Sequence, residues 1–146
     1  MLELFITFLA SFLVWFMVAG LFVLARKPGP SRREMVLHSL LAAFLAWSIA
    51  HLIKLVFPTP RPFELNGDTP LTLFAKSDGS FPSGHTALAF ALATSVFLHR
   101  HKVGLIFILA AIVVGLARVF GNVHYPVDIL GGAAIGVTTA LLISRH

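Results

Sequence analysis

The chain has 146 residues, of which 58% are hydrophobic and 12% are charged, and its mean hydropathy is +0.91. These values exclude an ordinary water-soluble domain, in which about a quarter of the residues are charged. The formal net charge of +5 could indicate nucleic-acid binding, but the basic residues stand in short clusters between apolar runs, as in membrane proteins. Because the chain has no cysteine, disulfides and cysteine-ligated metals are excluded.

The first apolar run, residues 4–25, contains no charged residue. It is long enough to cross a hydrocarbon core about 30 Å thick. Glu3 is the only charge before it, so the basic segment that opens a signal peptide is missing and a retained helix is favoured. Basic residues and helix breakers then mark a loop at 26–33.

Four more apolar runs follow, at residues 35–57, 83–98, 103–120 and 126–143. A polar stretch at 58–82 separates the first two of these, and a short turn at 121–125 separates the last two. The run at 83–98 is short for a membrane crossing, but the charged loops fall on consistent sides only if it crosses. The sequence therefore predicts an all-α, polytopic membrane helical bundle of about five transmembrane helices, forming a single domain over residues 1–146.

The basic residues of the connecting loops predict the orientation of this bundle. Seven of the eleven fall on one side of the membrane: Arg26, Lys27, Arg32, Arg33, Arg100, Lys102 and Arg145. Because cytoplasmic loops are enriched in Lys and Arg, this side is expected to be cytoplasmic. The N-terminus, the 58–82 loop and the 121–125 turn would then lie on the outer face.

The first group of unusual polar residues on that face is Lys54, followed six residues later by Arg61 and Pro62. Ionisable residues at membrane depth are costly, so each is a functional candidate that needs a partner. The alternative is that a lysine or arginine at a helix end, such as Lys54 or Arg118, extends its charge to the lipid headgroups.

The second group is Pro82-Ser83-Gly84-His85, at the start of the third apolar run. Ser83 is a preferred N-cap, and Gly84 allows a ligand to approach the backbone. Free backbone N–H groups at such a helix start bind phosphate. The alternative is an ordinary N-cap followed by a surface histidine.

The third group is Arg118, His124 and Asp128, with Pro126 suited to the first turn of the last helix. A carboxylate beside one imidazole nitrogen fixes the tautomer and leaves the other nitrogen free as a nucleophile. The alternative is that Asp128 only complements the helix dipole and His124 is a loop residue.

Together the three groups place cations, two histidines, one carboxylate and a helix start on one side of a small protein. Cations and backbone donors suit the oxygens of a transferring phosphoryl group. One histidine can attack phosphorus while the other protonates the leaving oxygen. Fixed positive charge replaces a metal in this scheme, so we expect neither a metal nor another cofactor at this site.

The spacings Lys54-x6-Arg61-Pro62, Pro82-Ser83-Gly84-His85 and Arg118-x5-His124-x3-Asp128 resemble the three signature motifs of the type 2 phosphatidic acid phosphatase (PAP2) superfamily. The resemblance implies an all-helical fold and a phosphohistidine intermediate. It implies the following roles: His124 as nucleophile, Asp128 as its orienting carboxylate, His85 as general acid, and Lys54, Arg61, Ser83, Gly84 and Arg118 as phosphate-binding residues.

Two features depart from the family pattern. The third motif usually opens with a serine before the arginine, and here Ala117 occupies that position, which removes one hydrogen-bond donor. Members of this kind commonly have six transmembrane helices, whereas five are predicted here. The missing helix would be the N-terminal one, which agrees with an outer N-terminus.

The leading functional hypothesis is a phosphatase of isoprenoid diphosphates, similar to bacterial undecaprenyl diphosphate phosphatases of cell-wall lipid recycling. It would lie in the inner (plasma) membrane with its active site on the extracytoplasmic face, and its partners would be the bilayer and a lipid phosphate, not nucleic acid. Phosphatidic acid, phosphatidylglycerophosphate and lipid A are alternative substrates. Soluble vanadium haloperoxidases share a similar site, and a non-enzymatic lipid-binding protein would use the cations for headgroups alone. The sequence leaves the oligomeric state open.

Two other sets of residues receive structural readings. His38, His99, His101 and His146 are interpreted as structural or incidental, and Glu64, Asp68 and Asp78 as solvated. A possible guide for a lipid tail is formed by Phe57, Phe63, Leu71, Leu73 and Phe74.

Overall fold

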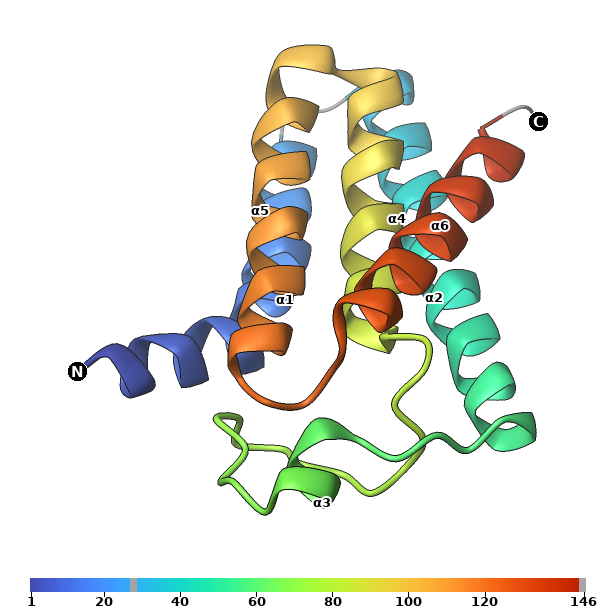
Figure 1. The fold of residues 1–146 in the computed structure, drawn as a ribbon. Helices are drawn as coiled ribbons and strands as arrows, with labels where there is room; N and C mark the ends of the chain where they lie inside the picture. The colour runs from blue at the N-terminus through green and yellow to red at the C-terminus, as the bar shows by residue number, and fades with distance from the viewer. Residues whose placement is uncertain (27–28, 145–146) are drawn as a thin grey trace.

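The computed structural model describes residues 1–26 and 29–144 (Figure 1). Lys27, Arg145 and His146, which the sequence assigns to the cytoplasmic side, lie outside these described residues. Within the described residues there are six helices and no strand: α1 (Leu2–Ala25), α2 (Pro30–Val56), α3 (Pro62–Asn66), α4 (Gly84–His99), α5 (His101–Phe120) and α6 (Pro126–Ile143). The all-α prediction is confirmed.

The five predicted apolar runs correspond to α1, α2, α4, α5 and α6. Among the described helices, α1, α2, α5 and α6 are each long and apolar enough to cross a membrane. α4 is also apolar but has only 16 residues, below the length of a typical membrane-crossing helix. The sequence predicts about five transmembrane helices; five apolar helices are present among the described residues, and four of them meet the length of a full crossing.

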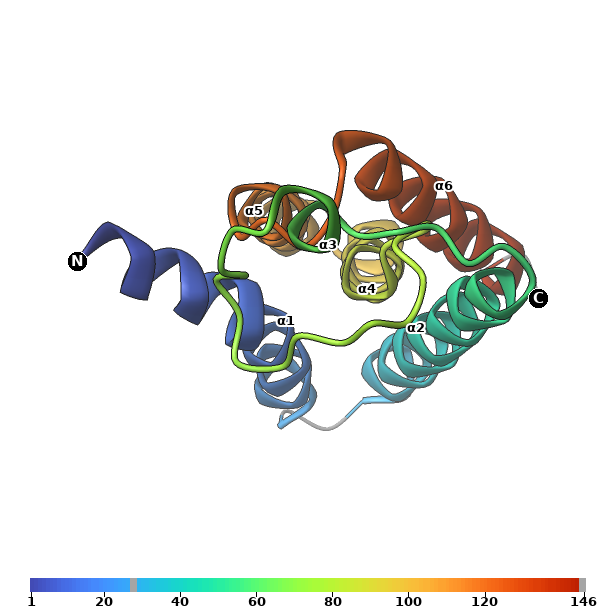
Figure 2. The ribbon, with the colours of Figure 1, turned by 60° about the horizontal axis from the view of Figure 1, so that its bottom comes forward.

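α4 lies at the centre of the bundle, surrounded by α1, α2, α5 and α6 (Figure 2). Small residues make this position possible, because Ala87 and Ala91 on α4 are fully buried. Gly132 and Gly136 on α6 face them so closely that a methyl group at either glycine would collide with a backbone carbonyl of α4. This Gly-x3-Gly pair thus packs α6 within the bundle, as small residues do between membrane helices.

The outer surface of the helices carries large apolar side chains. Phe16 on α1, Phe44 on α2, Leu109 on α5 and Leu130 on α6 are all more than half exposed. In water such a surface would favour aggregation, whereas lipid tails solvate it well. The exposed apolar surface therefore supports a bundle that is embedded in a membrane.

The 57–83 connection, which includes α3, covers one end of the bundle (Figure 1). The 121–125 turn lies at the same end, because the Leu71 amide donates to the Gly121 carbonyl (2.9 Å) and the Phe63 amide donates to the Asn122 carbonyl (3.2 Å). Asn122 and Asn66 also exchange side-chain hydrogen bonds. The two loops predicted to share a face do lie together, which brings the three sequence groups to one end.

Candidate active site

Residues of all three sequence groups line one cavity of about 610 Å³ at the loop-covered end of the bundle. Lys54 comes from the last turn of α2, Arg61 from the residue before α3, His85 from the first turn of α4, Arg118 from the last turn of α5, and His124 from the following turn. No two of these five share an element. The bundle therefore assembles the cavity from segments that are far apart in sequence.

His124 is buried, and hydrogen bonds on both sides of its ring fix its tautomer. Its Nδ1 lies 3.3 Å from Oδ2 of Asp128, and its Nε2 lies 3.4 Å from Nη1 of Arg61. A guanidinium can only donate, so Nε2 accepts and carries the lone pair, while the proton stays on Nδ1 and faces Asp128. The predicted contact between His124 and Asp128 is present, and the nitrogen on the cavity side is the unprotonated one.

Asp128 receives further hydrogen bonds that hold its carboxylate in place. Its Oδ2 accepts from the Ser80 hydroxyl and from the Tyr125 amide, the latter at 2.8 Å. The Ser80 hydroxyl also lies 3.5 Å from Nδ1 of His124. Ser80 is fully buried and was absent from the sequence predictions. A buried hydroxyl shared by a histidine and its carboxylate restricts the orientation of both.

The environment of His124 keeps its imidazole neutral. Burial is the largest cause and lowers the pKa of His124 from 6.5 to about 4. The hydrogen bond to Asp128 acts in the opposite direction, while the positive charges of Arg118, Arg61 and Lys54 lower the pKa further. At neutral pH the His124 imidazole is therefore neutral, as its predicted role of nucleophile requires.

Arg61 is fixed in the wall of the cavity by three protein oxygens. Its Nη2 forms an ion pair with Oδ1 of Asp78 at 2.7 Å, its Nε donates to the Asp78 carbonyl at 2.9 Å, and its Nη1 donates to the Val123 carbonyl at 3.1 Å. Asp78, interpreted from the sequence as solvated rather than catalytic, keeps 37% of its side chain exposed, and its carboxylate also orients Arg61. Partial burial alone would raise the pKa of Asp78, but Lys54 and Arg61 hold it below its usual value.

Lys54, Arg61 and Arg118 are almost completely buried, with relative exposures of 6%, 4% and 3%. The alternative in which Lys54 and Arg118 extend to the lipid headgroups is therefore not what the structure shows. Arg118 is held by the Ala10 carbonyl of α1 (2.9 Å) and by the Thr72 hydroxyl (3.4 Å), while its Nε is buried and has no hydrogen-bond partner among residues 1–26 and 29–144. Buried charge without a full set of partners is costly, so this cluster is suited to an anion.

Ser83 caps α4 as predicted: its hydroxyl accepts from the Thr86 amide at 3.4 Å and from the Thr86 hydroxyl at 3.0 Å. The Ser83 amide donates to the Asp128 carbonyl, so this N–H is already occupied. Gly84 and His85 both line the cavity. A side chain at position 84 would lie about 3.1 Å from the His51 ring, which explains why a glycine suits this position.

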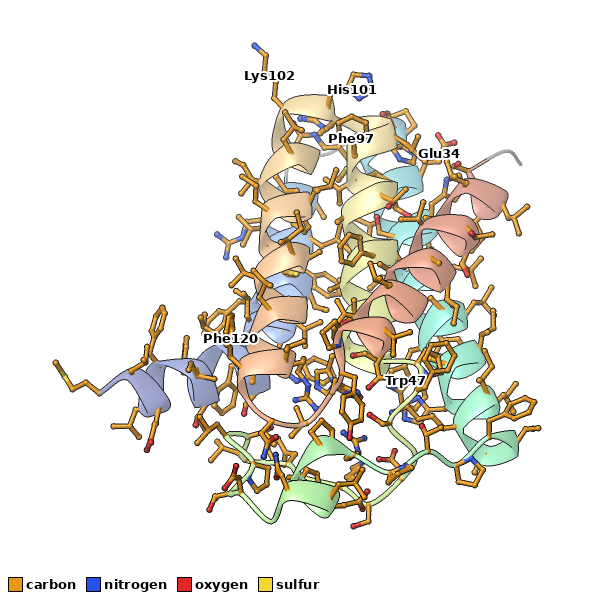
Figure 3. The ribbon with its side chains drawn as sticks, viewed as in Figure 1. Glu34, Trp47, Phe97, His101, Lys102 and Phe120 are labelled. Carbon is orange, nitrogen blue, oxygen red and sulfur yellow. The ribbon has the colours of Figure 1, made fainter. Side chains whose placement is uncertain are left out.

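Trp47 on α2, labelled in Figure 3, lines the cavity together with His51 of the same helix. The centroids of their rings lie 4.0 Å apart. Nδ1 of His51 lies 2.9 Å from the Trp47 carbonyl. This hydrogen bond stays within α2. The placement of His51 one turn before Lys54 was the signal that pointed to the site.

The cavity continues from the charged cluster into an apolar part. The side chains that line this part come from α1, α2 and α4, and they include Trp15, Val18, Leu40, Ala43, Phe44, Leu88 and Leu92. Of the five residues predicted to guide a lipid tail, Phe74 lines the cavity, and Phe57, Phe63, Leu71 and Leu73 do not. The apolar wall is therefore formed mainly by helices rather than by the outer loop.

Comparison with known proteins agrees with this geometry. The chain is 31% identical to the "Bacitracin transport permease protein BcrC" of Bacillus licheniformis over 93% of its own length and 67% of that protein. It is 32% identical to the "Undecaprenyl-diphosphatase BcrC" of Bacillus subtilis over 77% of its length and 58% of that protein. The chain thus spans between about half and two thirds of the curated relatives it matches.

Among solved structures, the crystal structure of Aquifex aeolicus LpxE is similar, with a TM-score of 0.77 and 31% sequence identity. The alignment covers 99% of this chain and 86% of that one. The sequence pattern of the PAP2 superfamily matches residues 35–146, which include all three sequence groups and most of the cavity. The chain therefore belongs to the PAP2 superfamily.

Proposed function

We propose that this protein is a metal-independent membrane lipid phosphatase that removes the terminal phosphate of an isoprenoid diphosphate through a phosphohistidine intermediate. The observation that carries the proposal is the position of His124, whose Nδ1 faces Asp128 while Nε2 lies beside Arg61 at the cavity. An unprotonated nitrogen among fixed cations is positioned to attack a bound phosphoryl group.

In the first step, the lone pair of His124 Nε2 attacks the terminal phosphorus, and the bond from phosphorus to the lipid-side oxygen breaks. His85 donates a proton to that departing oxygen. In the second step, water attacks the phosphohistidine, His85 takes a proton from this water, and the P–N bond breaks to release inorganic phosphate. Both histidines end in their starting states. Asp128 stabilises the positive charge that develops on the His124 ring.

Lys54, Arg61 and Arg118 would bind the non-bridging phosphate oxygens throughout. These charges are buried, and a bound anion would exclude water from the cavity. The attraction between the charges and the anion is then stronger than it would be in water. The Gly84 backbone lies at the start of α4, where helix N–H groups favour phosphate. Ser83 would contribute by capping this helix, since its hydroxyl accepts from Thr86.

The apolar part of the cavity supports a lipid substrate. It begins beside the charged cluster and is lined by α1, α2 and α4, so a hydrocarbon chain could extend between helices while its phosphate stays at His124. Lys76, which also lines the cavity, adds a further positive charge that suits a diphosphate. The resemblance to undecaprenyl-diphosphatase supports the same substrate class. Phosphatidic acid, phosphatidylglycerophosphate and lipid A remain alternative substrates, because the motifs contact only the phosphate.

The test is phosphate release by the detergent-purified protein in the presence of EDTA. The panel pairs undecaprenyl or farnesyl diphosphate with phosphatidic acid and phosphatidylglycerophosphate. We expect release that EDTA does not inhibit and that is fastest with an isoprenoid diphosphate. Preference for a phospholipid would move the assignment to the alternative substrates. Absence of release from every substrate by folded protein would contradict a phosphatase and favour a lipid-binding role.

The site is further proposed to face the extracytoplasmic side of the inner (plasma) membrane. The charged cluster lies at the end that carries the 57–83 connection, whereas Arg32, Arg33, Arg100 and Lys102 lie toward the other end. By the positive-inside rule, that other end is cytoplasmic. Single cysteines placed at Asn66 and at Lys102 would test this in intact cells. A membrane-impermeant maleimide should label the first and spare the second, and the reverse result would invert the topology.

A further inference from the structure

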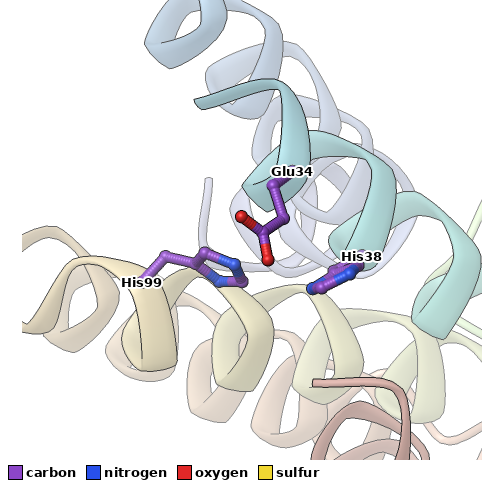
Figure 4. Close-up of side chains that lie close together, drawn as sticks. All are labelled: Glu34, His38 and His99. Atoms are coloured by element: carbon purple, nitrogen blue, oxygen red, sulfur yellow. The ribbon is translucent and has the colours of Figure 1, made fainter. Parts of the chain in front are cut away.

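The residues proposed to bind and attack the phosphate form the catalytic cluster at one end of the bundle. The opposite end carries a group of side chains that can act as metal ligands. Glu34 and His38 lie one turn apart on α2, and His99 is the last residue of α4. One carboxylate oxygen and one ring nitrogen from each histidine lie within 4.8 Å of one another. Figure 4 shows the Glu34 carboxylate directed toward the two rings, whose centroids are 5.4 Å apart. We propose that these three side chains bind a divalent transition metal of the zinc class.

The hydrogen bonding of the two histidines supports a ligand at this place. Nδ1 of His99 lies 2.8 Å from the Ser95 carbonyl, so it carries the proton and leaves Nε2 able to bind a metal. A backbone carbonyl that orients the second nitrogen is a usual feature of metal-binding histidines. Nδ1 of His38 is buried and has no hydrogen-bond partner within the described residues. A bound cation would satisfy this nitrogen, which is otherwise costly to bury.

The chemistry of the donor set narrows the class of metal. Two imidazoles and one carboxylate suit zinc and neighbouring transition metals, whereas magnesium and calcium prefer oxygen ligands alone. Rotation of the three side chains would have to bring their ligand atoms closer together, because ligand atoms around a tetrahedral ion lie about 3–3.5 Å apart. Glu34 is exposed, so it can make this adjustment. Arg33 and Arg100, next to two of the ligands in the sequence, oppose a cation, so we expect a reversible site rather than a permanent one.

The site would connect α2 to α4 far from the catalytic cluster. His38 precedes Lys54 by 16 residues on α2, and His99 follows His85 by 14 residues on α4. At 1.5 Å per residue, the two sites are roughly 20 Å or more apart along the helices. A metal here could not contact the phosphate, so its role would be to hold the ends of α2 and α4 together. The sequence interpretation of these histidines as structural or incidental did not foresee that they converge.

His101 offers a matched control. Its Nδ1 lies 2.7 Å from the Phe97 carbonyl, four residues earlier in the chain. His99 makes the same kind of contact with the Ser95 carbonyl, but His101 is not one of the three proposed ligands. His101 is exposed, and its ring packs on Phe97 at the outer edge of the α4–α5 connection (Figure 3). Replacing His101 removes an equivalent histidine from the same end of the molecule without touching the three proposed ligands.

The experiment uses the full chain, purified in detergent, freed of any histidine tag and treated with EDTA. Co²⁺ is titrated while its visible ligand-field bands are recorded, Zn²⁺ is then used to displace it, and thermal unfolding is measured with and without Zn²⁺. We expect one Co²⁺ per chain and a higher unfolding temperature with Zn²⁺. Glu34→Gln, His38→Gln and His99→Gln should each weaken binding by about tenfold or more, and His101→Gln should leave it unchanged.

Two results would overturn the proposal. One is the absence of Co²⁺ bands and of a Zn²⁺-dependent shift in the wild-type chain, which requires no variant to fold. The other is binding that His85→Ala abolishes while Glu34→Gln and His99→Gln leave it intact, since the metal would then occupy the catalytic cluster. Phosphate release in EDTA should be unaffected by Glu34→Gln, so this test and that of the proposed function fail independently.

Discussion

The side chain of His124 is held between an acidic and a basic partner, and each ring nitrogen has a distinct task. Asp128 and Ser80 lie at Nδ1, while Arg61 lies at Nε2. In the proposed mechanism, this arrangement leaves Nε2 unprotonated, as the attack on phosphorus requires. The spacing of His124 and Asp128 in the sequence was enough to predict their contact, because His124 closely precedes the last helix and Asp128 lies in the first turn of that helix. Ser80 could not be predicted in the same way, since a serine in a polar loop carries no pattern that points to a buried site.

Replacing each of the two histidines in turn distinguishes the proposed nucleophile from the proposed general acid. His124→Ala should reduce phosphate release by about four orders of magnitude or more, because no other group can form the intermediate. His85→Ala should slow release from a natural lipid by about a hundredfold and have less effect on p-nitrophenyl phosphate, whose leaving group needs no proton. Steady-state rates on both substrates measure this contrast. Equal losses on both substrates would contradict His85 as the general acid.

Ser80→Ala tests the positioning of Asp128. Loss of the hydroxyl frees the carboxylate and the His124 ring, so kcat should fall by about tenfold with little change in KM. Ser80→Thr keeps a hydroxyl and should restore part of the rate. A rise in KM with an unchanged kcat would instead indicate a role in substrate binding.

The lowered pKa of His124 predicts a pH dependence with a definite sign. Between its ordinary pKa of 6.5 and its folded value of about 4, the unfolded chain binds a proton that the folded chain does not. Stability should therefore fall as pH decreases through this window. Histidine NMR titration of the substrate-free protein in micelles should place the His124 midpoint well below 6.5. A midpoint at or above 6.5 would contradict the burial of a neutral His124.

At the scale of elements, the position of each apolar helix could be predicted, but the way the helices pack could not. The apolar runs predict five helices because each is bounded by charges, prolines or glycines. α3 escaped prediction because five residues are too few to show a period, although Pro62 stands at its first turn. The central place of α4 depends on contacts of small residues with several neighbours, and one sequence does not reveal which helices share them.

Close packing of α6 on α4 gives a prediction at this scale. Gly136→Ala should destabilise the protein by about 1–3 kcal/mol, because the added methyl collides with the Ala87 carbonyl. Gly20→Ala is the matched control, since its methyl would lie 3.5 Å from the Phe107 ring, at ordinary contact distance. Thermal unfolding in detergent compares the two variants. Similar unfolding temperatures for the two variants would contradict this prediction and show that the α4–α6 interface can accommodate the added methyl group.

At the scale of the whole molecule, four helices (α1, α2, α4 and α5) and two loops converge on a cavity that is charged at one end and apolar at the other. The charged end could be predicted, because three short motifs at fixed spacings carry it. The apolar end could not, since Trp15, Leu40 and Leu88 are ordinary members of apolar helices until the fold brings them together. The ion pair between Asp78 and Arg61 could not be predicted either, because the two residues are 17 positions apart in a connection whose path one sequence does not reveal.

The measurement that tests the central claim most directly is trapping of the intermediate. Folded protein is mixed with farnesyl diphosphate that carries a radiolabelled terminal phosphate, quenched in base, which preserves phosphohistidine, and digested into peptides. The mechanism predicts base-stable, acid-labile label on the peptide that contains His124, and none in His124→Ala. Rapid phosphate release with no label at His124, or label on another residue, would contradict the phosphohistidine mechanism.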